Sequence, residues 1–203
     1  SGSIDYSQFL GSNLIVLNEL NSFSSGLISE LLSYMESGGN VVLFPGSKCD
    51  ISSVNELMLG IKAGRFQNID TTNTKVSYLN FDHPIFTDVF EKIPNNMDLP
   101  KVSNSYRLEI SSRARVERLM KLQTGNDFLS KFSYGTGNAY VFTVPLSKDF
   151  SNLSSHSLFV TSLLKIAESS GAKQTISQTI SSNIVSMKDD NYELESIHIT
   201  NKD

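Results

Sequence analysis

A short apolar run, a helical segment and a second apolar run constrain the fold of this chain more than any other feature. Residues 14–17 (LIVL) and 41–44 (VVLF) are continuous apolar runs, which are typical of strands covered on both faces, as in a parallel sheet. Between them, five apolar residues recur at spacings of one, three and four: Leu27, Ile28, Leu31, Leu32 and Met35. Ser24 is the expected N-cap of this helix, and Gly38-Gly39 its expected end. The pattern predicts a right-handed β-α-β unit.

After the second apolar run, the pattern predicts a loop and a second helix. This helix is expected to begin near Ser52 or Ser53, with Ser53 and Glu56 as a capping box. The alternation then weakens, and we expect one strand at 75–79. Residues 82–84 (DHP) are typical of a turn before a short helix carrying Ile85, Val89 and Phe90, and residues 94–104 are expected to be loop.

In the second half of the chain the period shortens. Four segments are strand candidates separated by turn residues: 105–110, 117–122, 128–134 and 138–144. The connections GND and GTGN between the last of them are typical of hairpins, so we expect an antiparallel extension of the sheet. A final helix is expected from Ser154 or Ser155 to Gly171.

The domain organisation follows from these elements. We assign residues 4–171 to one α/β domain, a length that fits a single core. Residues 172–203 are expected to be a linker and the first strands of a following β module, with strand-like pieces at 183–187 and 192–199. Because the chain begins with Ser1-Gly2-Ser3 and not with Met, we expect it to be a piece of a longer protein.

The composition argues against several classes of protein. The formal net charge of −4 leaves no basic footprint for a phosphate backbone, so we expect no nucleic-acid partner. No apolar run approaches the roughly 18 residues that span a bilayer, so we expect no direct membrane insertion by this chain. The single cysteine excludes an internal disulfide and a metal site built from several cysteines.

Candidate ligand-binding residues follow the first two predicted strands, because ligands of open α/β sheets bind beyond the carboxyl ends of the parallel strands. The residues are Asn18, Glu19, Gly46, Ser47, Lys48 and Asp50. The loop 45–50 precedes a helix whose first N–H groups are suited to an anion. The alternative is structural: the loop is a turn and its polar residues cap the helix, which explains these residue types without any ligand.

Three residues were weighed as catalytic candidates: Cys49, His83 and His156. The nucleophile of a hydrolase elbow has glycine two residues away on each side, whereas Cys49 has Ser47 and Ile51. A lone cysteine outside such an elbow is typical of a small hydrophobic residue. Neither histidine is spaced from another ligand as in a zinc site. We therefore expect no catalytic residue, no metal and no cofactor.

Three stretches carry a resemblance to a known family: residues 31–46 (LLSYMESGGNVVLFPG), 82–90 (DHPIFTDVF) and 131–167 (KFSYGTGNAYVFTVPLSKDFSNLSSHSLFVTSLLKIA). Together they resemble the soluble class I glutamine-amidotransferase-like domain of aerotolerance-type (Bat) bacterial membrane proteins, which have an N-terminal double-transmembrane hairpin. Single pieces also resemble trehalose-utilisation and β-galactosidase-associated domains. The resemblance covers about residues 4–170.

The resemblance implies a flavodoxin-like three-layer sandwich whose first strand and helix would precede Ile4. It does not imply amidotransferase activity. True amidotransferases have a Gly-x-Cys-x-Gly elbow and a downstream His–Glu pair. Cys49 lacks the glycines, and His156 is not followed by a carboxylate at the two-residue spacing. What is implied is a fold without its catalytic apparatus.

The resemblance therefore favours a non-enzymatic ligand- or protein-binding domain of a membrane-anchored cell-envelope protein, on the periplasmic side. Its expected partners are other domains of the same membrane protein or envelope proteins. One alternative is a hydrolase or amidase that uses Cys49 with His83 or His156. The other is a carbohydrate-binding accessory domain. Because the chain has no Trp, three tyrosines would then have to stack on the sugar: Tyr106, Tyr134 and Tyr140.

Overall fold

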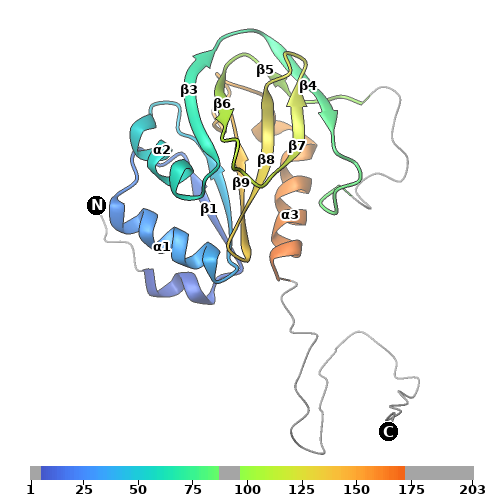
Figure 1. The fold of residues 1–203 in the computed structure, drawn as a ribbon. Coiled ribbons are helices and arrows are strands. Elements are labelled where there is room, and N and C mark those ends of the chain that lie inside the picture. The colour runs from blue at the N-terminus through green and yellow to red at the C-terminus, as the bar shows by residue number, and fades with distance from the viewer. Residues whose placement is uncertain (1–5, 87–96, 172–203) are drawn as a thin grey trace, which may run out of the picture. The chain divides into compact units, whose positions relative to one another are not determined.

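The computed structural model describes residues 6–86 and 97–171. Figure 1 shows the elements in chain order. The helices are α1 (Ser25–Glu36), α2 (Ile51–Gly60) and α3 (Ser157–Gly171), with 3-10 turns η1 (Tyr6–Gly11) and η2 (Leu153–Ser155). The strands are β1 (Leu14–Asn18), β2 (Asn40–Phe44), β3 (Gly64–Asp70), β4 (Thr74–Leu79), β5 (Lys101–Val102), β6 (Ser105–Ile110), β7 (Val116–Leu122), β8 (Asp127–Tyr134) and β9 (Gly137–Phe142).

Two expectations fall outside the described residues. The proposed β module at 172–203, with its strand-like pieces at 183–187 and 192–199, is one, so the division into two domains stays a prediction. The other is the part of the short helix that carries Val89 and Phe90. Among the described residues, no helix combines the length and the apolar character that crossing a bilayer requires.

The β-α-β unit forms as predicted from β1, α1 and β2. The two strands are parallel, with Leu14 opposite Asn40. The Ser24 side chain caps α1 by accepting a hydrogen bond from the backbone N–H of Leu27 at 3.2 Å. Gly38 follows the helix with a φ of 97°, a left-handed conformation that glycine adopts without strain.

A seven-stranded mixed sheet carries the fold, in the order β1-β2-β9-β8-β7-β4-β5. β1, β2 and β9 are parallel, and β8, β7, β4 and β5 continue the sheet in antiparallel pairing. The α/β class and an antiparallel extension are thus confirmed. We expected β9 inside the antiparallel extension. It instead joins the parallel and antiparallel parts of the sheet, because it pairs with β2 on one side and with β8 on the other.

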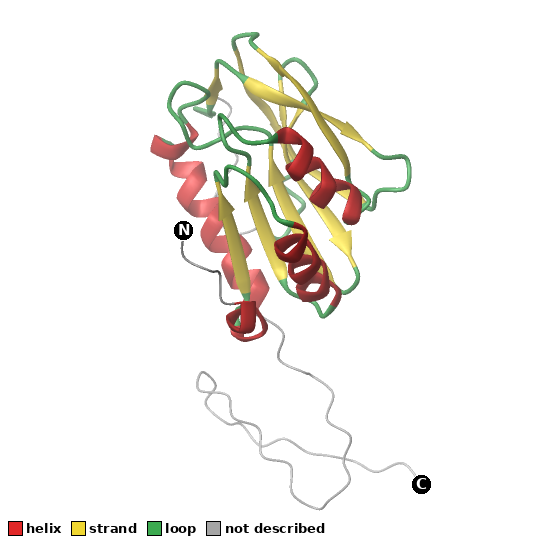
Figure 2. Cartoon of the chain, turned by 90° about the vertical axis from the view of Figure 1, so that its left-hand side faces the viewer, coloured by secondary structure: helices red, strands yellow, loops and turns green. Residues whose placement is uncertain are grey.

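Two hydrophobic cores lie on opposite faces of the parallel strands. The fully buried β2 contributes to both, since successive side chains of a strand point to opposite faces. Val41 and Leu43 pack with residues of α1 and α2, whereas Val42 and Phe44 pack with residues of α3. Figure 2 shows the corresponding arrangement, with α1 and α2 on one side of the sheet and α3 on the other.

The start of α2 differs from the prediction. Asp50 is the N-cap, and its Oδ1 accepts a hydrogen bond from the N–H of Ser52 at 3.0 Å. The capping box of Ser53 and Glu56 was therefore wrong. The hydroxyl of Ser53 instead donates to the Asp50 carbonyl at 2.9 Å and accepts from the buried N–H of Phe23 at 3.0 Å. Ser53 thereby ties α2 to the segment before α1.

Two strands were not predicted. Among the described residues, β3 pairs only with β6, and the two form a separate two-stranded ribbon. Only Gly64 and Phe66 of β3 are buried, so the sequence carries no sustained apolar alternation there. The two-residue strand β5 lies in the expected loop 94–104 and pairs with β4. The last helix, α3, begins at Ser157, two to three residues later than expected, because η2 occupies the preceding turn.

Candidate functional site

Glu19 lies at the carboxyl edge of the parallel strands, where the sequence places its candidate ligand groups. Its Oε1 accepts a hydrogen bond from the N–H of Leu146, in the segment after β9, at 2.7 Å. Its own N–H donates to the carbonyl of Phe44, the last residue of β2, at 3.1 Å. The backbone of Glu19 has a φ of 50°. Glu19 thus ties together the ends of three strands, and its carboxylate is already engaged within the protein.

The loop 45–50 is also held by internal contacts. The buried Gly46 carbonyl accepts a hydrogen bond from the Tyr106 hydroxyl at 2.8 Å. A Cβ at Gly46 would lie 3.2 Å from the Cβ of Cys49, so the loop folds closely upon itself. Asp50 caps α2, as the structural alternative expects. Of the other three candidates, Asn18 and Lys48 are exposed and Ser47 is half-buried.

Tyr106 is a polar neighbour of Cys49. Burial, followed by the proximity of Cys49 and Glu19, raises the pKa of the Tyr106 hydroxyl above its ordinary value of 10.0. The ring of Tyr106 stacks on Phe150 at a centroid distance of 6.1 Å and contacts Phe66 at 5.6 Å. A phenol that keeps its proton is no general base at neutral pH, so this contact does not activate the half-buried thiol.

Neither histidine candidate lies beside Cys49. His156 precedes α3, and its Nδ1 accepts a hydrogen bond from the N–H of Leu158 at 3.2 Å. His83 is buried, and its Nδ1 accepts from the N–H of Ile85 at 3.3 Å. Leu158 and Ile85 belong to the core under α3, whereas Cys49 packs against the core of α1 and α2. The sheet therefore separates both histidines from the cysteine.

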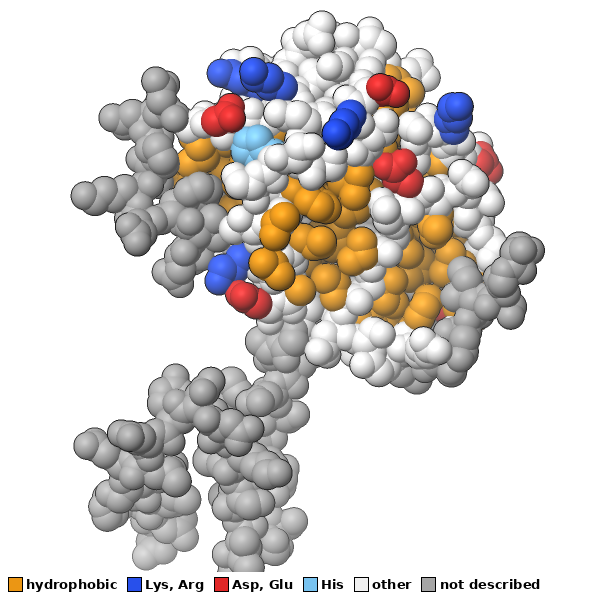
Figure 3. Space-filling view, turned by 180° about the vertical axis from the view of Figure 1, so that it is seen from behind, with side chains coloured by type: hydrophobic (Ala, Val, Ile, Leu, Met, Phe, Trp, Pro, Cys, Tyr) orange, Lys and Arg blue, Asp and Glu red, His pale blue; other side chains and the backbone are white. Residues whose placement is uncertain are grey.

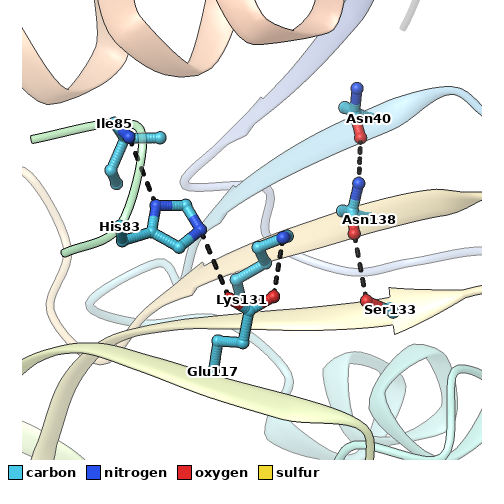
Figure 4. Close-up of polar contacts among 7 residues, drawn as sticks. All are labelled: Asn40, His83, Ile85, Glu117, Lys131, Ser133 and Asn138. Carbon is cyan, nitrogen blue, oxygen red and sulfur yellow. Dashed lines mark hydrogen bonds and ion pairs between the residues drawn. The ribbon is translucent and has the colours of Figure 1, made fainter. Parts of the chain in front are cut away.

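His83 instead belongs to a polar network drawn in Figure 4. Glu117 of β7 lies between His83 and Lys131 of β8, 3.5 Å from Nε2 of His83 and 2.7 Å from Nζ of Lys131. Burial and the charge of Lys131 lower the pKa of His83, although Glu117 opposes them. The hydrogen bond from Lys131 lowers the pKa of Glu117. Each charged group here has a partner within the protein.

A second polar row crosses the neighbouring strands close by, two residues along β8 from Lys131 (Figure 4). The hydroxyl of Ser133 donates to Oδ1 of Asn138 at 3.1 Å, and Nδ2 of Asn138 donates to Oδ1 of the buried Asn40 at 2.9 Å. The three residues come from β8, β9 and β2, which are neighbours in the sheet. Sequence reasoning missed both networks, because His83 and Asn40 are far along the chain from Glu117 and Asn138, the residues that they contact.

An open groove lies at the amino ends of β2 and β9, opposite the expected edge. Its volume is about 650 Å³. The ends of α1 and α2, the start of β3, the β6–β7 connection and the β8–β9 turn all contribute to it. The residues that give the groove its chemical character are Glu36, Leu59, Lys62, Arg113, Arg115 and Tyr134. We refer to these residues and the space between them as the amino-edge groove.

The two arginines of the groove differ from the other three of the chain. Those three are paired, Arg65 with Glu109, Arg107 with Asp70 and Arg118 with Asp127. Within residues 6–86 and 97–171, no carboxylate lies within ion-pair distance of Arg113, Arg115 or Lys62. The sequence shows Arg113 and Arg115 as close neighbours, but nothing in it places them beside the ends of two helices.

An apolar face is exposed over α3 and β1, as the patch at the centre of Figure 3 shows. Val160 and Leu164 of α3 are 55% and 57% exposed, and Val16 of β1 is 43% exposed. Val160 and Leu164 lie one turn apart on α3, and Val16 lies on the edge strand β1, which contacts α3.

The described parts of the chain bring together no three residues of the types that bind a metal ion.

Comparison with known proteins identifies the fold. No family model and no curated protein matches the chain. Solved structures do match. Two are Salmonella typhimurium proteins, with TM-scores of 0.63 and 0.61 and identities of 8% and 11%. They cover 83% and 81% of this chain, which in turn covers 75% and 74% of them.

A third similar structure is a Bacteroides uniformis protein described as "thua-like". It has a TM-score of 0.53 and 15% identity, and the match covers 80% of this chain and 70% of that protein. At such identities the likeness concerns the fold alone. The comparisons therefore support a mixed α/β fold of the kind that these three proteins share.

The comparison also corrects the expected localisation. Both Salmonella proteins are named as cytoplasmic proteins, which contradicts the periplasmic placement drawn from the family resemblance. That placement depended on the architecture of membrane-anchored relatives and on no residue of this chain. It was wrong on this comparison.

Proposed function

We propose that this chain is a non-enzymatic ligand-binding domain whose binding site is the amino-edge groove. The observation that carries the proposal is an open cavity of about 650 Å³ with two arginines that have no carboxylate partner among the described residues. Its volume is in the range of small-molecule sites. At the carboxyl edge, by contrast, Glu19, Gly46 and Asp50 are engaged in hydrogen bonds within the protein.

The non-enzymatic part of the proposal is supported by the surroundings of Cys49. Burial raises the pKa of its polar neighbour Tyr106, and the candidate bases His83 and His156 accept hydrogen bonds from Ile85 and Leu158, which belong to the opposite core. A cysteine nucleophile needs a base within hydrogen-bond reach or a lowered pKa. We therefore keep the hydrolase or amidase as the alternative, which requires Cys49 to react as a thiolate.

Two measurements test the proposed function. Backbone amide shifts of the intact chain, recorded with a small-fragment mixture, should change around Gly64 and Gly135 and leave the loop 45–50 unchanged. Alkylation of Cys49 by iodoacetamide at neutral pH should be no faster than that of a cysteine in a short peptide. Fragment shifts confined to the loop 45–50 would overturn the binding site. Alkylation many times faster than that of the peptide thiol would favour the enzyme.

The structure offers little to the carbohydrate-binding alternative. Tyr106 and Tyr140 are buried and have no free ring face for a sugar. Tyr134 lines the amino-edge groove, so its ring is the one of the three candidates that a ligand in the groove could reach.

Protein binding through the α3–β1 face is a second candidate, and the exposed Val160, Leu164 and Val16 favour it. β1 ends the sheet among the described residues and carries no charge, so its pairing with a second copy would bring no like charges together. We commit to a second copy as the occupant. Sedimentation velocity should show a dimer that Leu164→Glu converts to a monomer. Weak dimers have dissociation constants on the order of 100 μM. A wild-type chain that stays monomeric at about 100 μM or above would therefore exclude a dimer through this face.

We also propose a closer relationship for the fold than the comparisons establish. The three parallel strands with helices on both faces support a flavodoxin-like, amidotransferase-like core of reduced size. The likeness to a "thua-like" protein supports the same view, since pieces of the sequence resemble trehalose-utilisation domains. Membership in the aerotolerance-type family remains a proposal based on the three sequence stretches.

A further inference from the structure

The charge of the amino-edge groove is opposite in sign to that of the chain. Lys62, Arg113 and Arg115 line it with one carboxylate, that of Glu36, whereas the whole chain has a formal net charge of −4. All three cationic side chains are exposed. Elsewhere the arginines are neutralised by neighbouring carboxylates, as in the pair of Arg65 with Glu109 at 2.8 Å. A local excess of positive charge on an acidic protein attracts anions.

The helix ends beside the groove do not need these cations. Cationic side chains often interact with the carbonyl groups at helix C-termini. Here, carbonyls at the ends of α1 and α2 already accept hydrogen bonds from backbone N–H groups. The N–H of Gly39 donates to the carbonyl of Tyr34 at 2.8 Å, and the N–H of Ala63 donates to the carbonyl of Met58 at 2.9 Å. The hydroxyl of Thr136 donates to the carbonyl of Glu36 at 3.0 Å. These carbonyls therefore do not require the guanidinium groups of Arg113 and Arg115 as donors.

The groove also presents an apolar surface next to its charges. Leu59, at the end of α2, is 61% exposed, and the half-buried Tyr134, at the end of β8, also lines the groove. An exposed leucine beside unpaired arginines suits a ligand with an apolar body and an anionic end. A free inorganic ion would use the charges and leave the apolar surface in water.

Two glycines hold the segments around the groove close together. A Cβ at Gly64 would lie 2.0 Å from the carbonyl oxygen of Glu109, and one at Gly135 would lie 2.5 Å from the Cα of Glu36. Both residues have positive φ values, 130° and 57°. These contacts join β3 to β6 and the β8–β9 turn to the end of α1. The groove is therefore a preformed site, which lowers the entropic cost of binding.

We propose that the amino-edge groove binds a small molecule with a carboxylate or phosphate group and a flat apolar body. Arg113 and Arg115 would hold the oxyanion, for which the planar guanidinium is suited. Leu59 and Tyr134 would cover the apolar body. This inference rests on the proposed ligand-binding function, and it adds the chemical class of the ligand.

Titration of the intact chain with four probes tests the proposal, with backbone amide shifts and calorimetry as readouts. The probes are phenyl phosphate, benzoate, the neutral isostere benzamide and inorganic phosphate. We expect phenyl phosphate or benzoate to bind at least tenfold more tightly than benzamide, and more tightly than inorganic phosphate. Whichever of the two binds more tightly identifies the anionic group. Raising the salt concentration should weaken the binding.

Matched variants locate the site. Arg113→Gln and Arg115→Gln should each weaken binding of the better probe about tenfold, which corresponds to a hydrogen-bonded charge contact of about 1.4 kcal/mol. Arg113→Lys keeps the charge without the planar fork and should weaken binding less. Arg65→Gln removes an arginine outside the groove and should leave binding unchanged.

The possible failures are distinguishable. Equal binding of benzamide and benzoate in the groove would overturn the anionic class and leave the binding function standing. No shift at the groove with any probe or fragment would overturn both. If the glutamine variants unfold at lower temperature but bind the probe as tightly as the wild type, the arginines serve the helix ends and the inference is wrong.

Discussion

The two ends of the parallel strands use their polar residues in opposite ways. At the carboxyl edge, Glu19 and Asp50 accept backbone hydrogen bonds, and Tyr106 donates to the carbonyl of Gly46. At the amino edge, Arg113 and Arg115 have no carboxylate partner among the described residues, and the backbone beneath them is closed by glycines. Lys48 of the carboxyl edge is also exposed and has no carboxylate partner among the described residues, but it is a single cation. Because the other polar residues of that edge complete the fold, the amino edge, with its two arginines and open groove, is the better candidate site.

The largest effect on stability should come from adding a side chain at Gly64, where the backbones of β3 and β6 lie close together beside the groove. Gly64→Ala would place a Cβ 2.0 Å from the carbonyl oxygen of Glu109, at a φ of 130°. We expect the free energy of unfolding to fall by about 3 kcal/mol, since strain at a positive φ adds to a steric clash. Urea denaturation measures this loss.

Gly125→Ala is the matched control for this prediction. Gly125 also has a positive φ, 87°, but a Cβ there would meet nothing within 4 Å. This substitution should cost only the strain of the left-handed conformation, about 1 kcal/mol. An equal loss in the two variants would show that the contact with β6 does not hold the groove together.

A smaller effect should follow from removing the Glu19 carboxylate. Glu19→Ala leaves the N–H of Leu146 without its acceptor in a partly buried place. We expect a loss of about 1–2 kcal/mol in the free energy of unfolding, and a smaller loss for Glu19→Gln, whose amide oxygen can still accept. If Glu19→Ala is as stable as the wild type, the carboxylate is not required by the fold, and the carboxyl edge regains its place as a binding site.

The sequence predicts the elements whose residues pack within one continuous segment. The unit of β1, α1 and β2 is an example, because the apolar runs, the Ser24 cap and the Gly38 end are all local signals. The start of α2 was placed too late, near Ser52 or Ser53, since Asp50 and Ser53 both fit a cap and only the contact of Ser53 with Phe23 decides between them. β3 was missed because its single partner, β6, lies about forty residues away along the chain.

The candidate site was harder to predict for the same physical reason. The carboxyl edge follows from a general rule about parallel strands, and the residues there could be named in advance. The amino-edge groove depends on five segments that meet only in the folded chain, so Arg113 and Leu59 carry no local sign of their common surface. Cys49 could be assessed from its missing glycines, but its contact with Tyr106 required β6 to be placed.

The smallest effect is on the pH dependence of stability, and it concerns His83. Like Glu19 and Asp50, His83 has its polar partners within the protein, through Glu117 of β7 and Lys131 of β8. Burial and Lys131 hold its pKa below 6.5 in the folded chain, so the unfolded chain takes up a proton first as the pH falls. Stability should therefore decrease as the pH falls from 6.5 towards the folded-state pKa of His83. The pKa of Glu117 is also lowered, which decreases stability in the same direction, but only at pH values below the ordinary carboxyl pKa of 4.5.

His83→Asn keeps an acceptor for the N–H of Ile85 and removes the titrating ring. The free energy of unfolding in urea, measured between pH 5 and 7, should therefore depend less on pH in this variant. Glu117→Gln should retain or steepen the slope in this range, because it removes the charge that favours protonated His83. An unchanged slope in His83→Asn would mean that the network does not hold this histidine neutral. His83 would then no longer be an example of a buried group whose charge state is set by contacts within the protein.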